Sequence, residues 1–261
     1  MDGLKQRSKL VELYRKYPCR TLPNAYWKTE NKLEDLEVRI QKDSFGDASG
    51  LAVWDKDQVL ALWCRKRVDC PLSRRKLATF SFILVHDDAL SLLNGFIFDR
   101  REPYFRIIHK GDPPFYNCPP QHHYEAVNPE TDPKAIAEMI RACYPGSTMT
   151  DEEVRSWADH PVYDPSLWVW VRETATGRRV GLGIAELDPK IREASLEWIQ
   201  VLPDEQGKGL GKAIVAEILR RVAGRASFTT VSGCEDNLTH PERLYRRCGF
   251  TGSDVWWLLV K

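Results

Sequence analysis

A glycine-rich turn in the last third of the chain has the residue types needed to bind an anionic group. It reads Gln206-Gly207-Lys208-Gly209-Leu210-Gly211-Lys212. Glycines at alternate positions let the backbone turn tightly and leave consecutive N–H groups uncovered. The turn precedes an expected helix, and the positive end of a helix dipole favours an anion. We therefore expect a phosphate or pyrophosphate to bind at this turn, with Lys208 and Lys212 adding positive charge.

Three phosphate-binding patterns have to be separated at this turn. A Walker A loop needs G-x-x-x-x-G-K-[ST], but Lys212 is followed by Ala213. A dinucleotide fingerprint needs G-x-G-x-x-G in the first βα unit of a parallel sheet, whereas here the glycines alternate and come after several expected strands. The remaining pattern is Q-x-x-G-x-G from Gln206 to Gly211. An ordinary glycine-rich turn is the alternative interpretation.

Hydrophobic periodicity predicts a mixed α/β arrangement around this turn. The expected strands are 124–127, 167–173, 180–188, 194–201, 228–232 and 255–260. The expected helices begin at Pro133 and at a hydroxyl cap near residue 148, and continue with 212–223 and 242–250. The turn is thus placed between a strand that ends at Val201 and a helix.

The first half of the chain gives a weaker pattern. An amphipathic helix is expected at 4–17, a hairpin at 51–54 and 59–64, and short strands within 79–85, 93–98 and 104–110. The segment 22–45 has no clear type. Prolines crowd residues 111–121 and predict a linker. We therefore expect an α/β or α+β domain at 1–112 and a second domain at 122–261.

Composition excludes several classes of protein. The chain is 43% hydrophobic and 29% charged with a net charge of +1, which is typical of a globular protein and argues against nucleic acid or a membrane as partner. Its 7 cysteines include no C-x-x-C pair, which argues against a zinc ribbon or a disulfide framework. No metal site is expected. The sequence shows no secretory signal or membrane span, so we expect a cytoplasmic protein with reduced thiols.

Residues 122–261 resemble the GCN5-related N-acetyltransferases, the GNAT family. The family's pyrophosphate loop is [RQ]-x-x-G-x-[GA], which Gln206 to Gly211 match. The family also has a strand just before the loop, and a later Asn followed by a helix with the pattern Tyr-x-x-x-Gly-Phe. Asn237, Tyr245, Gly249 and Phe250 match that pattern.

The resemblance implies a mixed, mostly antiparallel sheet flanked by helices and an acyl transfer from acetyl-CoA. It implies that backbone groups of the strand before the loop, at Ile199, Gln200 and Val201, pair with the pantetheine arm. It implies that the loop from Gln206 through Gly207, Lys208, Gly209, Leu210 and Gly211 to Lys212 holds the pyrophosphate. Asn237 would meet the pantetheine or the adenosine end, and Tyr245 would protonate the leaving thiolate.

The general base is the least defined part of the resemblance. The histone-type enzymes have a glutamate at the position that aligns with Ser195, and serine does not serve as that base. Glu197 lies two residues further on, so strand alternation predicts that it lies on the same face. Glu193 lies two residues before. We predict Glu197 as the base, directly or through water, with a solvated strand glutamate as the alternative.

The sequence therefore predicts an N-acetyltransferase whose acceptor is a small-molecule or peptide amine of unidentified structure. The alternative is a non-catalytic acyl-CoA-binding regulatory protein with the same fold. A degenerate GNAT-like copy is one interpretation of residues 1–112, and a homodimer is another open point. A basic cluster at 65–67 and 74–76 has a solvated loop as its ordinary interpretation.

Overall fold

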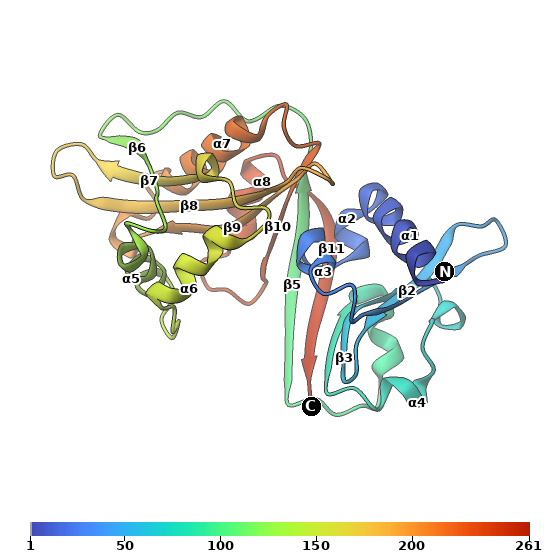
Figure 1. Cartoon of the computed structure of the whole chain (residues 1–261). Coiled ribbons are helices and arrows are strands. Elements are labelled where there is room, and N and C mark those ends of the chain that lie inside the picture. Colours follow the sequence, from blue (N-terminus) through green and yellow to red (C-terminus); the bar gives the residue numbers. More distant parts are fainter. Residues whose placement is uncertain (1) are drawn as a thin grey trace. The chain divides into compact units, whose positions relative to one another are not determined.

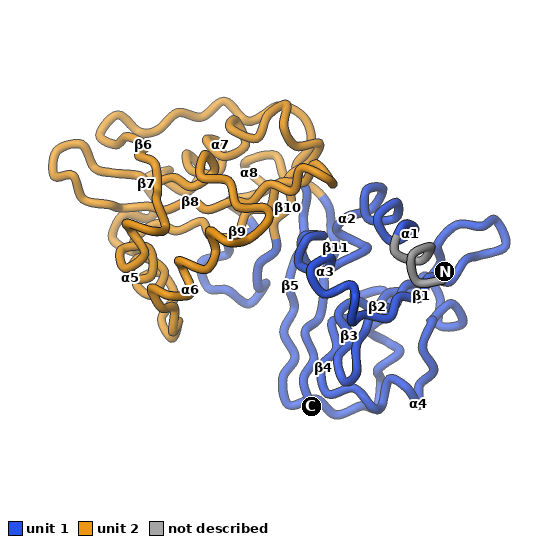
Figure 2. The backbone as a smooth tube through the Cα atoms, in the orientation of Figure 1, with its two compact units in different colours: residues 1–108, 232–242, 252–261 blue, residues 109–231, 243–251 orange. Residues whose placement is uncertain are grey.

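The computed structural model describes residues 2–261, with side chains from Ser8 onward. It divides the chain into two compact units (Figures 1 and 2). The first unit comprises residues 1–108, 232–242 and 252–261, and the second comprises residues 109–231 and 243–251. The units are therefore interleaved along the chain. The predicted domain boundaries at 112 and 122 stay a prediction, and each unit is described by itself below.

The first unit combines short helices with a sheet. Its helices are α1 (Asp2–Lys16), α2 (Pro18–Thr21), α3 (Tyr26–Glu30) and α4 (Arg74–Leu77). Its strands are β1 (Glu37–Lys42), β2 (Ala48–Trp54), β3 (Gln58–Cys64), β4 (Phe82–His86), β5 (Arg100–His109) and β11 (Thr251–Val260). They follow the order β1-β2-β3-β4-β11-β5, so the last strand of the chain lies between two strands of the N-terminal half.

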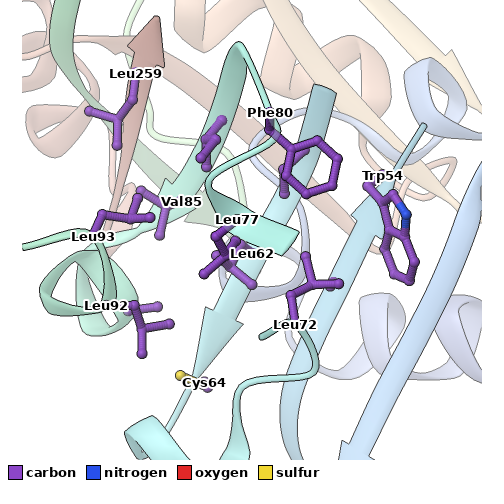
Figure 3. Close-up of a cluster of buried hydrophobic side chains, with 14 residues drawn as sticks. Trp54, Leu62, Cys64, Leu72, Leu77, Phe80, Val85, Leu92, Leu93 and Leu259 are labelled. Atoms are coloured by element: carbon purple, nitrogen blue, oxygen red, sulfur yellow. The ribbon is translucent and has the colours of Figure 1, made fainter. Parts of the chain in front are cut away.

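A hydrophobic cluster forms the core of this unit (Figure 3). Leu62 of β3, Val85 of β4 and Leu259 of β11 are fully buried within it. Phe80 and Leu77 close the cluster beside the strands. Residues separated by almost the whole chain thus share one core, and β11 contributes to it directly.

The second unit carries a five-strand sheet with the order β10-β9-β8-β7-β6. The strands are β6 (His122–Ala126), β7 (Trp168–Glu173), β8 (Arg179–Asp188), β9 (Glu193–Val201) and β10 (Phe228–Cys234). The helices are α5 (Pro133–Cys143), α6 (Asp151–Ser156), α7 (Leu210–Val222) and α8 (Pro241–Arg247). Neighbouring strands from β6 to β9 are antiparallel, and β9 with β10 is parallel. This mixed, mostly antiparallel sheet flanked by helices confirms the predicted fold class.

Helices cover both faces of that sheet. A Cβ added to Gly183 of β8 would lie 2.4 Å from Ile214 of α7, so a glycine is needed where this helix packs closely on the strand. On β9, Trp198 contacts aromatic rings from the segments that follow α5 and α6. Val201 instead approaches the start of α7 at Gly211. Because residues three apart on a strand point to opposite faces, α7 covers one face and the segments after α5 and α6 lie over the other.

The predicted elements agree with the structure except in two places of the first unit. The apolar run at 93–98 is not a strand: residues 87–93 form a 3-10 helix, and a turn at Gly95 follows with φ of 84°. The segment 22–45, which the sequence left unassigned, holds α3 and β1. All three elements are seven residues or shorter, which gives local periodicity too few residues to define them.

Candidate functional site

The glycine turn forms an open cradle at the start of α7. Gly207 and Gly209 have φ of 80° and 84°, which is the left-handed region where side chains are strained. Gly209 is the N-cap residue, and α7 begins at Leu210. A Cβ added to Gly207 would meet nothing within 4 Å. At Gly207 the backbone is therefore uncovered close to a helix start, where the helix dipole favours an anion, and this geometry fits a phosphate group.

The two lysines beside the turn are in different electrostatic environments. The Nζ of Lys208 lies 2.7 Å from the carboxylate of Glu205, so its charge is already compensated. The Nζ of Lys212 lies 4.5 Å from the ring centre of Tyr116. Among the described residues Lys212 makes no ion pair. Of these two cations, Lys212 therefore keeps its charge available to an anion in the turn.

Gln206, the first residue of the pattern, joins the turn to the strand. Its Nε2 donates a hydrogen bond to the carbonyl of Val201 at 3.2 Å. The glutamine thereby fixes the distance between the end of β9 and the cradle. The structure gives this side chain a positioning role. The sequence had indicated Gln206 only as one residue of a binding loop.

The strand β9 has an open edge next to the turn. Its parallel pairing with β10 runs from Phe228 opposite Glu193 to Val231 opposite Leu196, although β9 itself continues to Val201. The backbone from Glu197 onward is thus outside this ladder. Predicted contacts at Ile199, Gln200 and Val201 all fall in that stretch. The amide groups of an extended ligand such as a pantetheine arm can pair with backbone groups along such an edge.

Gln200 adds a buried polar group to this part of the strand. The residue is 2% exposed, and its side chain lies within hydrogen-bonding reach of the Tyr144 phenol. Buried amides normally have such a polar partner. The predicted role of Gln200 in binding the pantetheine arm rests on its backbone, and the side chain is a further feature that the sequence did not reveal.

Tyr245 of α8 is buried, with 7% of its surface exposed. Its ring contacts Phe250 edge to face, with ring centres 5.7 Å apart. Burial raises the pKa of Tyr245, and the neighbouring Tyr144 and Glu197 raise it further. The hydroxyl therefore keeps its proton throughout the neutral and mildly alkaline range. A protonated phenol close to β9 is what a proton donor to a leaving group requires.

Glu197 lies at a β-bulge. The register of β8 with β9 pairs Ile184 with Trp198 and Ala185 with Leu196, which leaves Glu197 as the extra residue. A bulge breaks the alternation of side chains along a strand. Strand alternation therefore does not decide on which face of the sheet Glu197 lies, and its place on the face of Ser195 stays a prediction. The role of Glu197 as base stays a prediction, supported by its electrostatic effect on Tyr245.

Sequence reasoning missed a polar network around Ser195. The Oγ of Ser195 donates to the carboxylate of Glu186 at 3.4 Å, and the Nδ1 of His160 lies 3.4 Å from the same carboxylate. Glu186 is 7% exposed and lies opposite Ser195 in the β8–β9 register. A carboxylate from the neighbouring strand is thus placed beside the serine. Only the register of the hairpin, which the sequence left open, would have indicated it.

Asn237 is described with the first unit. Its side-chain oxygen accepts hydrogen bonds from the backbone N–H of Thr239 at 2.9 Å and from the Thr239 hydroxyl at 2.8 Å. These local bonds form a turn before α8. The structure gives Asn237 this role in the turn, and its predicted contact with the cofactor stays a prediction.

Residues 2–261 hold neither a metal-binding cluster nor a membrane-spanning helix. No group of three or more His, Cys, Asp or Glu residues among them is arranged to hold a metal ion. None of the helices described is both long enough and apolar enough to span a membrane.

Comparison with known proteins identifies the fold and its main domain. Residues 164–252 match the family model described as acetyltransferase (GNAT) domain. The protein thus contains a GNAT acetyltransferase domain, which confirms the resemblance. No match was found among curated proteins.

Solved structures extend the likeness to the whole chain. A GCN5-related N-acetyltransferase from Sphaerobacter thermophilus is 18% identical with a TM-score of 0.63, over 86% of this chain and 80% of that chain. A Drosophila protein is 13% identical with a TM-score of 0.64, over 100% and 97%. A tandem GNAT protein from the clavulanic acid biosynthesis pathway is 15% identical with a TM-score of 0.58, over 100% and 94%. At these identities the likeness establishes the fold.

Proposed function

We propose that the protein is an N-acetyltransferase that moves an acetyl group from acetyl-CoA to a primary amine. The observation that carries the proposal is the left-handed glycine turn at Gly207 and Gly209, open at Gly207, beside the stretch of β9 that leaves the ladder with β10. A cradle for phosphates and an edge for an extended arm, side by side, suit coenzyme A better than a simple phosphate. The acetyltransferase (GNAT) domain match at 164–252 supports the same activity.

The residues of the second unit divide the binding task among them. The N–H groups from Gly207 to Gly211 would bind the pyrophosphate, with Lys212 adding charge. The backbone from Ile199 to Val201 would pair with the pantetheine arm. The thioester supplies an activated acyl group when acetyl-CoA is bound. Holding this group and the amine together removes much of the entropic barrier to transfer.

Two side chains would handle the protons. An ammonium acceptor must first lose a proton, and Glu197 would take it directly or through water. The amine nitrogen then forms a bond to the acyl carbon while the carbon–sulfur bond breaks. Tyr245 would give its proton to the leaving thiolate, and a raised pKa keeps that proton in place until the thiolate forms. The nitrogen, positively charged after the attack, would lose its second proton to the Tyr245 phenolate. The products are then a neutral amide and a free thiol, and Tyr245 recovers its proton.

The acceptor is an amine of a small molecule or a peptide, as the sequence indicated. The seven free cysteines are compatible with a reducing compartment such as the cytoplasm. The likeness of the full chain to a tandem GNAT protein supports the interpretation of the first half as a degenerate GNAT-like copy. A homodimer remains an open proposal that mass measurement in solution would test.

A non-catalytic acyl-CoA-binding protein is the second candidate. The serine at position 195, where the histone-type enzymes have a glutamate, favours it. An acceptor screen with acetyl-CoA and detection of released thiol separates the two candidates. Thiol release with any amine supports the enzyme, and tight acetyl-CoA binding without release by any amine supports the regulatory protein.

The binding part of the proposal is tested by Gly209→Asp. An aspartate here would bring a carboxylate to the turn, and its Cβ would displace the Tyr116 hydroxyl. We expect calorimetry to show acetyl-CoA binding weakened by more than about tenfold, or about 1.4 kcal/mol. Gly46→Asp controls for the left-handed backbone alone, because Gly46 also has φ of 84° but a Cβ there would meet nothing within 4 Å. If Gly209→Asp melts at the same temperature as Gly46→Asp and binds acetyl-CoA with unchanged affinity, the loop does not bind the cofactor.

A further inference from the structure

A tyrosine outside the recognised motif lies directly on the glycine turn. Tyr116 belongs to a segment without helix or strand, residues 113–120, which we call the strap. Its hydroxyl oxygen is 2.3 Å from the point that a Cβ on Gly209 would occupy. Position 209 therefore requires glycine for two reasons, the left-handed backbone and the contact with this hydroxyl. The contact connects the strap to the turn on which the proposed function rests.

The ring of Tyr116 also holds Lys212. The Nζ of Lys212 lies 4.5 Å from the ring centre, which is within the range of a cation–π contact. Lys208, in contrast, is paired with Glu205. A carboxylate would cancel the charge of a lysine and occupy its N–H donors. A neutral aromatic ring fixes the ammonium from one side and leaves its charge and its donors for an anion.

The strap is fastened to the same helix beyond the tyrosine. Prolines at 113, 114, 119 and 120 restrict its backbone. The side chains of Cys118 and Tyr124 are hydrogen-bonded to each other. The hydroxyl of Tyr124 donates to the carbonyl of Ala213, in the first turn of α7, at 2.8 Å. The strap is thus attached to the start of α7 on the C-terminal side of Tyr116, and this attachment and its prolines restrict the position of Tyr116.

We infer that Tyr116 is a positioning residue for the phosphates of acetyl-CoA, acting by holding the charged Lys212 at the glycine turn. The inference rests on the proposed function, because the anion it concerns is that of the same site. It assigns a binding role to the strap, which the sequence indicated only as a linker. It also explains why an aromatic residue lies in a proline-rich segment next to a helix start.

The test is a double-mutant cycle read by calorimetry with acetyl-CoA on the full chain. Tyr116→Leu removes the ring and should weaken binding about threefold to tenfold. Tyr116→Phe keeps the ring and should stay within about twofold of the parent. In a Lys212→Met background, Tyr116→Leu should have no further effect, because the residue through which it acts is gone. Phe115→Leu is the matched control, since Phe115 is the neighbouring aromatic residue and is 94% exposed.

Several results would overturn the inference. One is an unchanged acetyl-CoA affinity in Tyr116→Leu. Another is a loss of affinity from Tyr116→Leu that is equally large in the Lys212→Met background. A third is tighter acetyl-CoA binding in Tyr116→Leu, which would show that the strap covers the site. Melting curves of each variant show whether the fold is kept. If Tyr116→Leu does not fold, Tyr116→Phe replaces it in the test. A loss of acetyl-CoA affinity in Tyr116→Phe as large as in Lys212→Met would contradict a role for the ring. If the parent chain itself binds no acetyl-CoA, the proposed function fails and the inference fails with it. If the parent binds and the variants match it, only the inference fails.

Discussion

Tyr245 is the residue whose chemistry the structure defines best. Its burial keeps the phenol protonated, so it can act as an acid and not as a base. We expect Tyr245→Phe to lower kcat by about 10²-fold with little change in acetyl-CoA affinity, because only the proton donor is lost. Steady-state kinetics with calorimetry check this. Equal turnover in the variant and the parent would remove Tyr245 from the mechanism.

The base is a second question at the scale of single residues. Glu197 at the bulge and Glu186 beside Ser195 are two carboxylates near the point where β9 and β10 part. We expect Glu197→Gln to lower kcat/KM most strongly near neutral pH, where the acceptor is still an ammonium ion and a carboxylate is ionised and can act as a base. Glu186→Gln is the isosteric comparison and should lower it less. The reverse ranking would transfer the role of base to Glu186 and its neighbour His160.

At the scale of elements, α7 connects the anion cradle to the core. Its Glu217 is 6% exposed and is paired with Arg220 and, at 2.7 Å, with Arg221. Burial alone would raise the pKa of Glu217, but the hydrogen bonds from both arginines outweigh it and hold the pKa below its usual range. The ionised carboxylate thus favours the folded state and stabilises the helix that carries the cradle.

We expect Glu217→Gln to lower the free energy of unfolding by about 1–3 kcal/mol at neutral pH. Because the folded pKa is lowered, the stabilisation is present above the unfolded pKa and is lost as the pH falls through the folded pKa. The difference between variant and parent should therefore shrink below about pH 4 in denaturant titrations. Glu138→Gln on α5 is the control, since its pair with Lys134 is exposed and 3.9 Å long. If Glu217→Gln lowers the free energy of unfolding as little as Glu138→Gln does, the buried ion pair does not stabilise the fold.

At the scale of the whole molecule, β11 decides which pieces of the chain can fold. The strand is the last in the sequence, yet it pairs with β4 of the first unit. Its Trp256 is 1% exposed and donates a hydrogen bond to the carbonyl of Cys19 at 2.8 Å. Asp254 lies 3.0 Å from the ring of His86. A cut between the predicted domains would therefore remove β11 from its neighbours.

We expect the fragment 118–261 to be insoluble or to melt without cooperativity, because it exposes Trp256 and Leu259 of β11. Co-expression with residues 1–117 should restore a soluble complex. Solubility and thermal melting check both expectations. A fragment that alone melts sharply and binds acetyl-CoA would show that the predicted contiguous boundary is the correct one.

The sequence by itself determined the features that depend on neighbours along the chain. The cradle from Gln206 to Gly211 could be predicted because glycine spacing and the following helix are local properties. The strands and helices of the second unit could be predicted for the same reason, since each has its own apolar period. Tyr245 was identified by its spacing to Gly249 and Phe250, and the structure adds that it is buried.

Only the tertiary structure decided the features that depend on segments meeting in space. The bulge at Glu197 follows from the register of two strands, and a one-residue change in register cannot be read from either strand alone. The contact of Tyr116 with Gly209 joins residues far apart in the sequence, through a segment whose prolines indicated nothing but a linker. The position of β11 between β4 and β5 also depends on the tertiary structure. Trp256 and Leu259 of β11 are buried by residues from the opposite end of the chain. An apolar pattern indicates that a strand is buried. Which segment packs against that strand depends on the tertiary structure.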